Sequence, residues 1–575
     1  MRCLKRLSIV VVLLLPVIIQ AQASDEEVRK EKQRRVGLLV DQILADAQDL
    51  KLSENRAYVY ARTGAILWNT DKKRARTLFQ NAVSELIAAR DAAASSNKAL
   101  AFQIDMLNQS IRPSILNTIA ARDAEFALES FYRSRPAILQ RAIEAQGAKP
   151  SKISNIGTNY EYLINNERNL EQSLMRMAAE QSPERAVKLL KAAIDRGFSD
   201  ETPNLLKRLN DKDPETASEL AKEIIGKLID KGFNTNERPD YRKLNLATNL
   251  LNEAVREKSP NDKGLQLDPS QERTLAEKLI AYHTGDNRSE YFSFYALLPI
   301  AEKFVPASVA RIKELGKANV GRGWGDYDPD VSKLLSSDAT AEKLLGEAKK
   351  FPMNSRRQIY QSAASKYAQE GDITSALAVV NENFSDDALT DAVNNLNSQY
   401  SYSLIGAGKY ADAERVIDEF PENARLSALV NLANSIYGAD TEKNRSHAAL
   451  VLGKARALLP DKPENSNDLQ GFTQVMYAFA SIEPTEAFRM FESLVPQLNE
   501  LTDAAAILNA FQGGSGVKQG EFLISQGNFG VYMDMSSLRP LGAKDFDRTM
   551  KLVDSFSRRE IRTMLRLQMA ENEGN

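Results

Sequence analysis

The stretch DPETASELAKEII, residues 213–225, carries a pattern that the chain repeats and that decides its fold. SPERAVKLLKAAI occupies residues 182–194, and EPTEAFRMFESLV occupies residues 483–495. In each phrase a polar residue precedes a proline, and an alanine follows four residues after the polar one. Repetition of one short phrase at distant places indicates repeated structural units, not a single catalytic motif.

The residues of the phrase are those that begin and end a helix. Asp213 can accept from the free N–H groups of the first turn, and Pro214 stands where a missing N–H costs little. The apolar positions then recur at helical spacing, as Ala217, Leu220, Ala221, Ile224, Ile225 and Leu228. Gly232 can adopt the left-handed conformation that follows a helix, and Phe233 can fold back onto the last turn. Gly197 and Phe198 close the first copy in the same way.

Looser copies place an alanine four residues after a polar cap elsewhere in the chain. The pairs are Asp71 and Ala75, Asp123 and Ala127, Asp372 and Ala376, and Glu483 and Ala487. A small residue early in a helix lets a neighbouring helix approach closely. We therefore predict an all-α protein, an α-solenoid of stacked helix–turn–helix repeats.

The block from residue 361 to residue 421 resembles a known repeat family. Its residues that match are Ala364, Tyr367, Gly371, Ile373, Ala376 and Val380, followed by Gly408, Tyr410, Ala413 and Ile417. They resemble two degenerate tetratricopeptide-like (TPR-like) hairpins, in which the glycine lies near the turn between two helices. The spacing from Gly371 to Gly408 is 37 residues, against the 34 of the consensus, and the tryptophan-leucine opening is missing. The resemblance implies a TPR-like α-solenoid, and the chain is also similar to exported bacterial helical-repeat proteins, for which no function is implied.

The first 23 residues have the pattern of a secretory signal peptide. Arg2, Lys5 and Arg6 precede an apolar run, and Ala21-Gln22-Ala23 offers a cleavage site. The run is shorter than the ~20 residues of a membrane-spanning helix, so a retained anchor is the weaker reading, and no second long apolar run follows. We predict an exported chain, periplasmic or extracellular and of bacterial type, with no transmembrane segment after cleavage. Its only cysteine, Cys3, would be removed, which excludes disulfides and thiolate metal sites.

Charge composition argues against a nucleic-acid partner. Without residues 1–23 the chain has 72 Lys and Arg against 77 Asp and Glu, a net charge of about −5. There is no basic excess to attract a phosphate backbone. A protein or peptide ligand is the expected partner, because stacked repeats create an extended concave surface.

Breaks in the helical pattern divide the chain. We predict a first helical array at residues 24–316, beginning with a charged helix at 24–49 that caps it, then a Gly- and Asp-rich connecting loop at 317–337. A TPR-like array follows at 338–512, then a Gly-rich insert at 513–540, and a C-terminal helix with a frayed tail at 541–575. Within the insert, residues 521–525 and 531–533 are predicted to form a short β-hairpin around Gln526-Gly527-Asn528, the one place where strands are expected.

The connecting loop contains the candidate site residues. Asp326, Asp328 and Asp330 alternate in GRGWGDYDPD, and alternating carboxylates can collect on a calcium ion. Pro329, Val331 and Ser337 depart from the EF-hand pattern, so calcium is a candidate only, and no other cofactor is expected. Trp324 in the same loop is a candidate binding residue, although an anchor between the two arrays is the favoured interpretation. Trp68, at a hairpin turn, is predicted to lie in the core.

No catalytic motif stands out. Of the two histidines, His283 and His447, neither belongs to an HExxH or a nucleophile-elbow motif. The loop GGSGVK at residues 513–518 fails the phosphate-loop spacing, since Gln519 stands where a hydroxyl should bind magnesium. The expected function is therefore a non-catalytic scaffold that binds a protein, a peptide or a cell-envelope component. The alternative is an envelope-acting hydrolase whose carboxylates come from non-adjacent repeats.

Overall fold

The computed structural model describes most of the chain. The described residues are 25–94, 111–136, 139–140, 157–181, 198, 201–235, 238–256, 265–285, 294–319, 329–336, 338–512, 516–527, 529–531 and 538–574.

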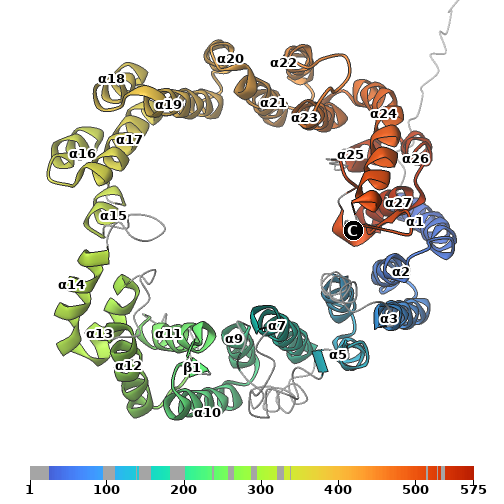
Figure 1. Cartoon of the computed structure of the whole chain (residues 1–575). Coiled ribbons are helices and arrows are strands. Elements are labelled where there is room, and N and C mark those ends of the chain that lie inside the picture. Colours follow the sequence, from blue (N-terminus) through green and yellow to red (C-terminus); the bar gives the residue numbers. More distant parts are fainter. Residues whose placement is uncertain are drawn as a thin grey trace, which may run out of the picture.

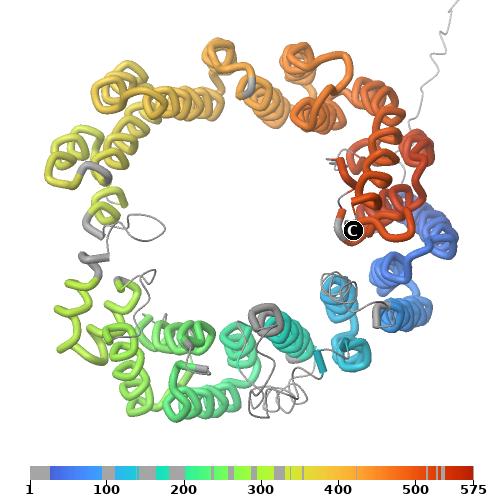
Figure 2. Tube along the Cα trace, in the orientation of Figure 1, coloured from blue at the N-terminus to red at the C-terminus, as the bar shows by residue number. Residues whose placement is uncertain are grey.

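The described helices follow one another around a ring, and the end of the chain returns to its beginning (Figure 1). The coloured tube runs from blue to red around an open centre, and its blue and red ends lie side by side (Figure 2). The prediction of an all-α helical-repeat solenoid is confirmed. The solenoid is not open, however, because its two ends pack against each other.

The first half of the ring contains a series of α-helices in the part of the chain that the structure describes. They are α1 (Asp25–Gln48), α2 (Ser53–Leu67), α3 (Lys72–Ala94), α5 (Ala124–Arg133), α7 (Gly157–Gln181), α9 (Thr202–Lys212), α10 (Pro214–Lys231), α11 (Tyr241–Val255), α12 (Pro269–Thr284), α13 (Leu298–Phe304) and α14 (Val309–Asn319). Short 3-10 helices, η1 (Phe294–Leu297) and η2 (Pro306–Ser308), flank α13. A further helical stretch at residues 111–120 precedes α5.

The second half repeats the hairpin pattern more regularly. Its helices are α15 (Pro329–Leu335), α16 (Ala341–Ala348), α17 (Met353–Gln369), α18 (Ile373–Asn383), α19 (Asp386–Gly406), α20 (Tyr410–Asp418), α21 (Glu422–Ala439), α22 (Arg445–Ala457), α23 (Ser466–Ile482), α24 (Pro484–Phe511), α25 (Leu538–Lys544), α26 (Phe546–Asp554) and α27 (Arg559–Gly574). Between α24 and α25 lie β3 (Val517–Lys518), β4 (Glu521–Phe522) and η3 (Ile524–Gln526).

The repeated phrase at residues 213–225 forms the N-cap and the first turns of helix α10. Asp213 Oδ1 accepts from the backbone N–H of Thr216 (3.2 Å), and Asp213 Oδ2 accepts from the Thr216 hydroxyl (2.7 Å). The hydroxyl bond comes first among the causes that lower the pKa of Asp213. The predicted apolar stripe is buried, Gly232 has φ +64°, and Phe233 is buried behind it. The copy at residues 182–194 lies outside the described residues, as does its closing Gly197, whereas Phe198 is buried.

The alanines that follow the caps are packed as predicted. Ala75, Ala127, Ala376 and Ala487 are all fully buried. Asp71, Asp123 and Asp372 each accept a backbone N–H of the first turn. Glu483 begins α24 without a side-chain cap bond. Local capping and close helix packing therefore go together around the ring.

Gly232, which ends α10, allows a direct test of the prediction that local capping residues fix the ends of the helices. We expect Gly232→Ala to cost about 1 to 3 kcal/mol of folding stability, because its φ of +64° and ψ of −172° fall in a region that essentially only glycine populates. Gly226→Ala is the matched control within the same helix, since a Cβ there meets nothing within 4 Å. That control should be neutral or stabilising. Urea unfolding of both variants measures the difference, and equal stabilities would contradict the account.

In the second half of the ring, alternate helices lie on the inner and outer circumference. Helices α17, α19, α21 and α23 lie nearer the centre, and α16, α18, α20 and α22 lie outside them (Figure 1). Each inner helix contacts the next, from α17 to α19, α21 and α23. The two layers bury a core between them and leave the remaining face of each inner helix toward the centre.

The hydrophobic core shows how the ring closes. One large cluster contains residues from Leu52 to Leu315, together with Leu523 from the insert. A second contains residues from Leu404 to Ala570, together with Leu39, Ile43, Ala47, Leu50 and Val59 from α1, α2 and the turn between them. The apolar face of α1 is thus buried against the far end of the chain. Helix α1 forms as predicted, but it joins the two ends instead of capping one.

A buried polar network reinforces this junction. Glu521 is almost fully buried, and its carboxylate accepts from the backbone N–H of Lys51 (2.8 Å) and Leu52 (3.3 Å). Asn55 Nδ2 donates to Glu521 Oε1 (2.6 Å) and to the Phe522 carbonyl (2.7 Å), and Asn55 Oδ1 accepts from Ile524 N–H (2.9 Å). Both the nitrogen and the oxygen of the Asn55 side-chain amide thus form hydrogen bonds across the junction.

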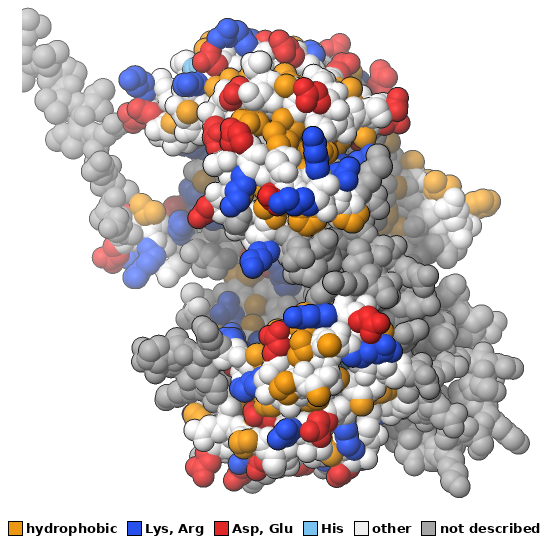
Figure 3. All heavy atoms as spheres, turned by 90° about the vertical axis from the view of Figure 1, so that its left-hand side faces the viewer, with side chains coloured by type: hydrophobic (Ala, Val, Ile, Leu, Met, Phe, Trp, Pro, Cys, Tyr) orange, Lys and Arg blue, Asp and Glu red, His pale blue; other side chains and the backbone are white. Residues whose placement is uncertain are grey.

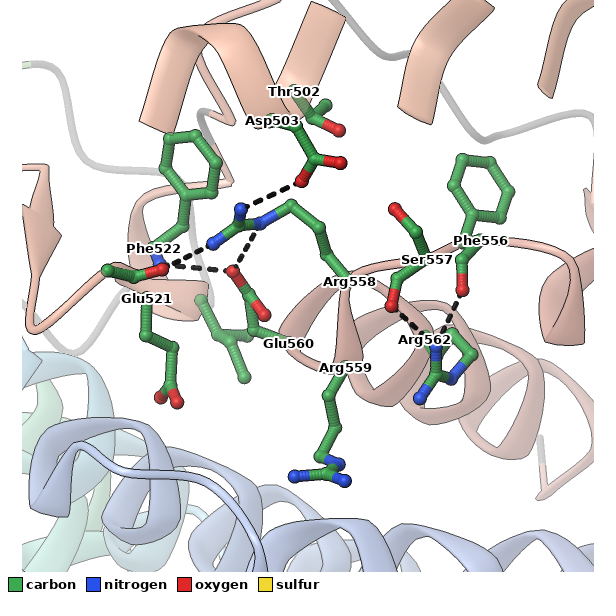
Figure 4. Close-up of polar contacts among 12 residues, drawn as sticks. Thr502, Asp503, Glu521, Phe522, Phe556, Ser557, Arg558, Arg559, Glu560 and Arg562 are labelled. Carbon is green, nitrogen blue, oxygen red and sulfur yellow. Dashed lines mark hydrogen bonds and ion pairs between the residues drawn. The ribbon is translucent and has the colours of Figure 1, made fainter. Parts of the chain in front are cut away.

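The C-terminal side of the junction holds the insert in place. Arg558 lies between the carboxylates of Asp503 (3.0 Å) and Glu560 (2.7 Å) and also donates to the Gly520 carbonyl (Figure 4). Glu560 in turn accepts from Phe522 N–H (3.2 Å). The hairpin β3–β4 is therefore held by residues of α24 and α27 on one side, and it contacts α2 on the other.

Ion pairs between residues far apart in the sequence complete the contact. Arg62 pairs with Glu571 (2.5 Å), Lys518 with Glu54 (2.8 Å), Arg559 with Asp49 (3.4 Å), and Arg566 with Asp46. The Arg559 pair is exposed on both sides, so it adds little. The pairs of Arg62 and Arg566 fix the register of α2 and α1 against α27, and the pair of Lys518 joins the insert to α2.

Three expectations need correction. The insert contains a hairpin, but its strands are Val517–Lys518 and Glu521–Phe522, not residues 521–525 and 531–533. The turn is Gln519-Gly520, with φ of +51° and +77°, the backbone that a two-residue hairpin favours. A second two-residue ladder pairs β1 (Asn234–Thr235) with β2 (Arg238–Pro239), where no strand was expected. Finally, the tail from residue 571 continues α27 to Gly574, because Glu571 pairs with Arg62.

Candidate functional site: the inner face of the ring

The residues predicted to form a site lie largely outside the described part. Trp324, Asp326 and Asp328 are not among the described residues, and Asp330 is described only as backbone at the start of α15. The structure therefore does not test the prediction that these aspartates bind calcium. Among the described residues, no three His, Cys, Asp or Glu side chains are grouped so that they could hold a metal ion. Nor is any described helix long and apolar enough to cross a membrane.

The two histidines have different environments. His283 lies on α12, is 3% exposed and meets the Tyr282 ring edge-on, with centroids 5.6 Å apart. Desolvation by burial lowers its pKa from 6.5 to about 4, so the imidazole is neutral at physiological pH. His447 is exposed on the outer helix α22. The structure thus places the two imidazoles on different elements of opposite halves of the ring. Trp68, predicted to be core, stacks on Phe79 with centroids 5.6 Å apart.

Burial of His283 predicts a pH dependence of stability. Its pKa is lowered in the folded state, so the unfolded chain binds a proton more readily between pH 6.5 and about 4. The contribution of neutral His283 is therefore fully present above pH 6.5 and is lost as the pH falls toward 4. We expect His283→Gln to flatten this slope in melting temperature, and His447→Gln, a change at an exposed position, is the control. Identical slopes in the wild type and in His283→Gln would contradict the prediction.

Three of the inner helices, α19, α21 and α23, contain long runs without charge. Residues 392–406 of α19, 426–439 of α21 and 469–482 of α23 contain no Asp, Glu, Lys or Arg. At the chain's overall charged fraction of 26%, each run would hold about four such residues. Burial against the outer layer explains part of this, but the exposed positions within the three runs are uncharged too, and exposed acidic residues such as Asp391 and Glu422 lie outside the runs, toward the N-terminal ends of α19 and α21.

Amides and phenols occupy those exposed positions. Helix α19 exposes Asn395 and Tyr402, α21 exposes Asn431 and Asn434, and α23 exposes Gln470 and Tyr477. Their spacing along each helix is three or seven residues, which keeps them on one face. We call these six residues the amide–tyrosine face. Since the other faces of α21 pack against α20, α22, α19 and α23, this one lies toward the centre of the ring.

Hydrogen bonds link neighbouring inner helices within this layer. Asn431 Nδ2 donates to the Tyr402 hydroxyl (3.2 Å), which joins α21 to α19. Ser427 donates to Gln474 Oε1 (3.1 Å), which joins α21 to α23, and Ser403 donates to the Gln369 carbonyl (3.4 Å), which joins α19 to α17. These bonds link each of the four inner helices to the next, and one of them, between Asn431 and Tyr402, joins two residues of the face itself.

The outer helices hold the charge instead. Helix α20 carries Asp412, Glu414, Arg415 and Asp418, and α22 carries Arg445, Lys454 and Arg456. On the side of the ring that faces the viewer in Figure 3, basic and acidic side chains are interspersed over the described surface, with no large patch of one sign. The contrast separates a conventional solvated exterior from an uncharged inner face.

The opposite side of the ring repeats the same chemistry on one helix. Helix α11 lies on the inner side of α10 and α12 (Figure 1). It exposes Tyr241, Asn245, Asn249 and Asn252, at spacings of four, four and three residues. Tyr241 is 60% exposed and Tyr402 is 57% exposed, so both rings are available for contact. Similar side chains thus stand on both sides of the open centre.

A shallow depression lies away from this surface, between α24 and α26. It has a volume of about 620 Å³ and is lined by Glu492, Asp545, Asp547, Arg548, Lys551, Leu552 and Ser555. Arg548 pairs with Glu492 (2.8 Å) and covers the Phe488 ring. One of the two basic residues in its lining, Arg548, is therefore already paired with a carboxylate of the same depression.

Sequence reasoning directed at catalytic motifs missed the amide–tyrosine face. The signal is present in the sequence as three long runs without charge, in which Asn, Gln and Tyr take positions that a solvated helix normally gives to Lys or Glu. Finding it requires knowing which helices lie inside the ring.

Comparison with known proteins adds little to this geometry. No protein family model matches the chain, and no curated protein matches it. One solved structure that it resembles is described as a "Circular tandem repeat protein with novel repeat topology and enhanced subunit contact surfaces". The two sequences are 13% identical, the match covers 92% of this chain and 98% of that one, and the TM-score is 0.20. A TM-score this low supports no inference about this chain.

Proposed function

We propose that this protein is an exported, non-catalytic scaffold that binds a protein, a peptide or a cell-envelope component on the inner face of its ring. The observation that carries the proposal is the amide–tyrosine face. Amide side chains offer both donors and acceptors, and they lose less on desolvation than charged groups do. An uncharged polar surface with exposed aromatic rings is therefore suited to a partner that displaces its water.

The kind of repeat and the compartment belong to the same proposal. Gly371 and Gly408 have φ of +88° and +71° at the turns before α18 and α20, which supports TPR-like hairpins. Export rests on the apolar run and cleavage pattern of residues 1–23, and the near balance of charge argues against nucleic acid. The hydrolase alternative would need a carboxyl group with a raised pKa. Every described carboxylate with a resolved shift has its pKa lowered, as for Asp213, Asp268 and Glu342.

Site-specific photo-crosslinking in living cells tests the proposal. A benzophenone amino acid replaces Tyr402 or Tyr477 on the inner face, and Leu450, 70% exposed on the outer helix α22, serves as the control position. We expect a discrete crosslinked species from the inner positions that is absent from the control. Equal or absent crosslinking at all three positions would reject the inner face as the binding surface.

A further inference from the structure

We propose that the amide–tyrosine face binds an extended, uncharged stretch of polypeptide, chiefly through its main chain. This inference rests on the proposed function and narrows it to one class of ligand. It follows from the chemistry of the side chains, their spacing across helices and the three uncharged runs in which the six residues of the face lie.

The side chains match the hydrogen-bonding groups of a peptide unit. An Asn or Gln amide can donate to a backbone carbonyl and accept from a backbone N–H at the same time. Such amides are exposed on each of three successive inner helices, at Asn395, at Asn431 and Asn434, and at Gln470. Helix α17 continues the series with the exposed Gln358 and Gln361. A polar group that satisfies the peptide main chain leaves the sequence of the ligand largely free.

The spacing of the helices suits an extended chain. Packed helices lie about 8 to 10 Å apart, and an extended polypeptide advances about 3.3 Å per residue. A chain crossing α17, α19, α21 and α23 would therefore meet a new helix about every three residues. About ten residues would span the four helices, and each helix would offer at least one amide to the ligand.

Lack of charge restricts the ligand further. No Lys or Arg lies within the three uncharged runs to pair with a carboxylate or phosphate, and no Asp or Glu to pair with an amine. A charged ligand segment would lose its water without gaining a partner. Tyr402 and Tyr477 instead offer flat, largely apolar rings that suit small or aliphatic side chains.

A glycan is the competing class of ligand, because hydroxyl groups also bind amides and sugar rings stack on aromatic side chains. The amide–tyrosine face has amides on all of its helices but rings on only α19 and α23. Recognition of a peptide main chain would use the amides, which are present on every helix of the face, so the observations favour a polypeptide ligand over a glycan.

Fluorescence anisotropy on the full chain from Ser24 tests the inference. The probe is a labelled pool of peptides about twelve residues long, drawn only from Ser, Thr, Asn, Gln, Gly, Ala and Val. A second pool carries N-methyl groups on alternate residues, which removes main-chain donors while retaining the side chains. The triple variant N395A/N434A/Q470A changes only exposed inner positions, and N381A/H447A changes exposed positions on the outer helices α18 and α22.

We expect saturable binding of the first pool, with affinity lowered at least about tenfold by N-methylation and by the inner triple variant, and unchanged by the outer variant. Three results would overturn the inference: no binding of the uncharged pool, equal binding of the N-methylated pool, or binding of a chitin hexasaccharide alone. Crosslinking at Tyr402 and Tyr477 distinguishes failure of the polypeptide assignment from failure of the proposed function. If it persists while the peptides fail, only the polypeptide assignment is lost, and if it fails as well, the proposed function is lost too.

Discussion

Replacing Glu521 by alanine is expected to open the ring at the junction of its two ends. The carboxylate accepts three hydrogen bonds from residues 51, 52 and 55, all on the far side of the junction. Its loss leaves three donors without their charged acceptor, at a cost of about 3 kcal/mol or more. Amide hydrogen exchange in α1 should then accelerate about a hundredfold, because this helix is held chiefly by the junction.

Two control variants sharpen this prediction. Glu521→Gln retains one carbonyl oxygen in place of Oε1, so it should accelerate exchange less than alanine does. Arg559→Ala removes an ion pair in which both partners are exposed, and it should leave exchange nearly unchanged. Exchange in α1 that is no faster in Glu521→Ala than in Arg559→Ala would show that Glu521 does not hold the ends together.

Substitution of Gly530 by alanine is expected to dislodge the insert from α24. A Cβ at this position would lie 2.3 Å from the Ala505 Cβ, and the backbone φ is +78°. Backbone strain of about 1 to 3 kcal/mol adds to overpacking of about 1 to 3 kcal/mol, a total of about 2 to 6 kcal/mol. Phe529 is fully buried beside Gly530 and packs edge-on against Phe522, so displacement should expose both rings. The measurement is the free energy of unfolding in urea.

A double-mutant cycle separates the two causes. Ala505→Gly removes the atom that the new Cβ would strike, and it should restore the steric part of the loss in Gly530→Ala but not the backbone strain. Gly37→Ala is the control for alanine substitution in general, because a Cβ there meets nothing within 4 Å. Purely additive effects of the two substitutions would contradict the proposed contact.

Features that depend on neighbouring residues were predictable from the sequence. The cap at Asp213, the turn at Gly232 and the buried Ala217 all follow from interactions within about one helical turn, and the same holds for Asp372 and Ala376. These rules are sufficient to predict an all-α helical-repeat fold.

Closure of the ring could not be predicted in that way. Asn55 and Glu521 are separated by 466 positions, and neither occurs in a pattern that announces a partner. From its sequence alone, the charged helix at residues 24–49 is consistent with a terminal cap. In the structure, its apolar face belongs to the same hydrophobic cluster as Leu565 and Leu567 of α27. Closure depends on the summed curvature of all the repeats, which no single window of sequence contains.

The β-hairpin was predicted within the correct insert but around the wrong glycine. Both Gly520 and Gly527 have positive φ, but only Gly520 follows a residue, Gln519, that also adopts positive φ. Gly527 instead ends the 3-10 turn η3. Sequence alone could not choose between the two glycines, because a non-glycine residue with positive φ is rare and is held there by its surroundings. The amide–tyrosine face was missed for a related reason, since its members are scattered until the ring gathers them.

The distance between the two ends of the ring tests the central claim, that the helices enclose a single inner surface. A chain from Ser24 has no cysteine, so Gln42→Cys on α1 and Lys551→Cys on α26, both exposed, can carry spin labels specifically. Because α1 packs on α27 and α27 on α26, the account predicts a narrow distribution centred at about 20 to 30 Å, roughly two or three interhelical spacings. A broad distribution extending beyond about 50 Å, as an open solenoid with free ends would produce, would contradict it.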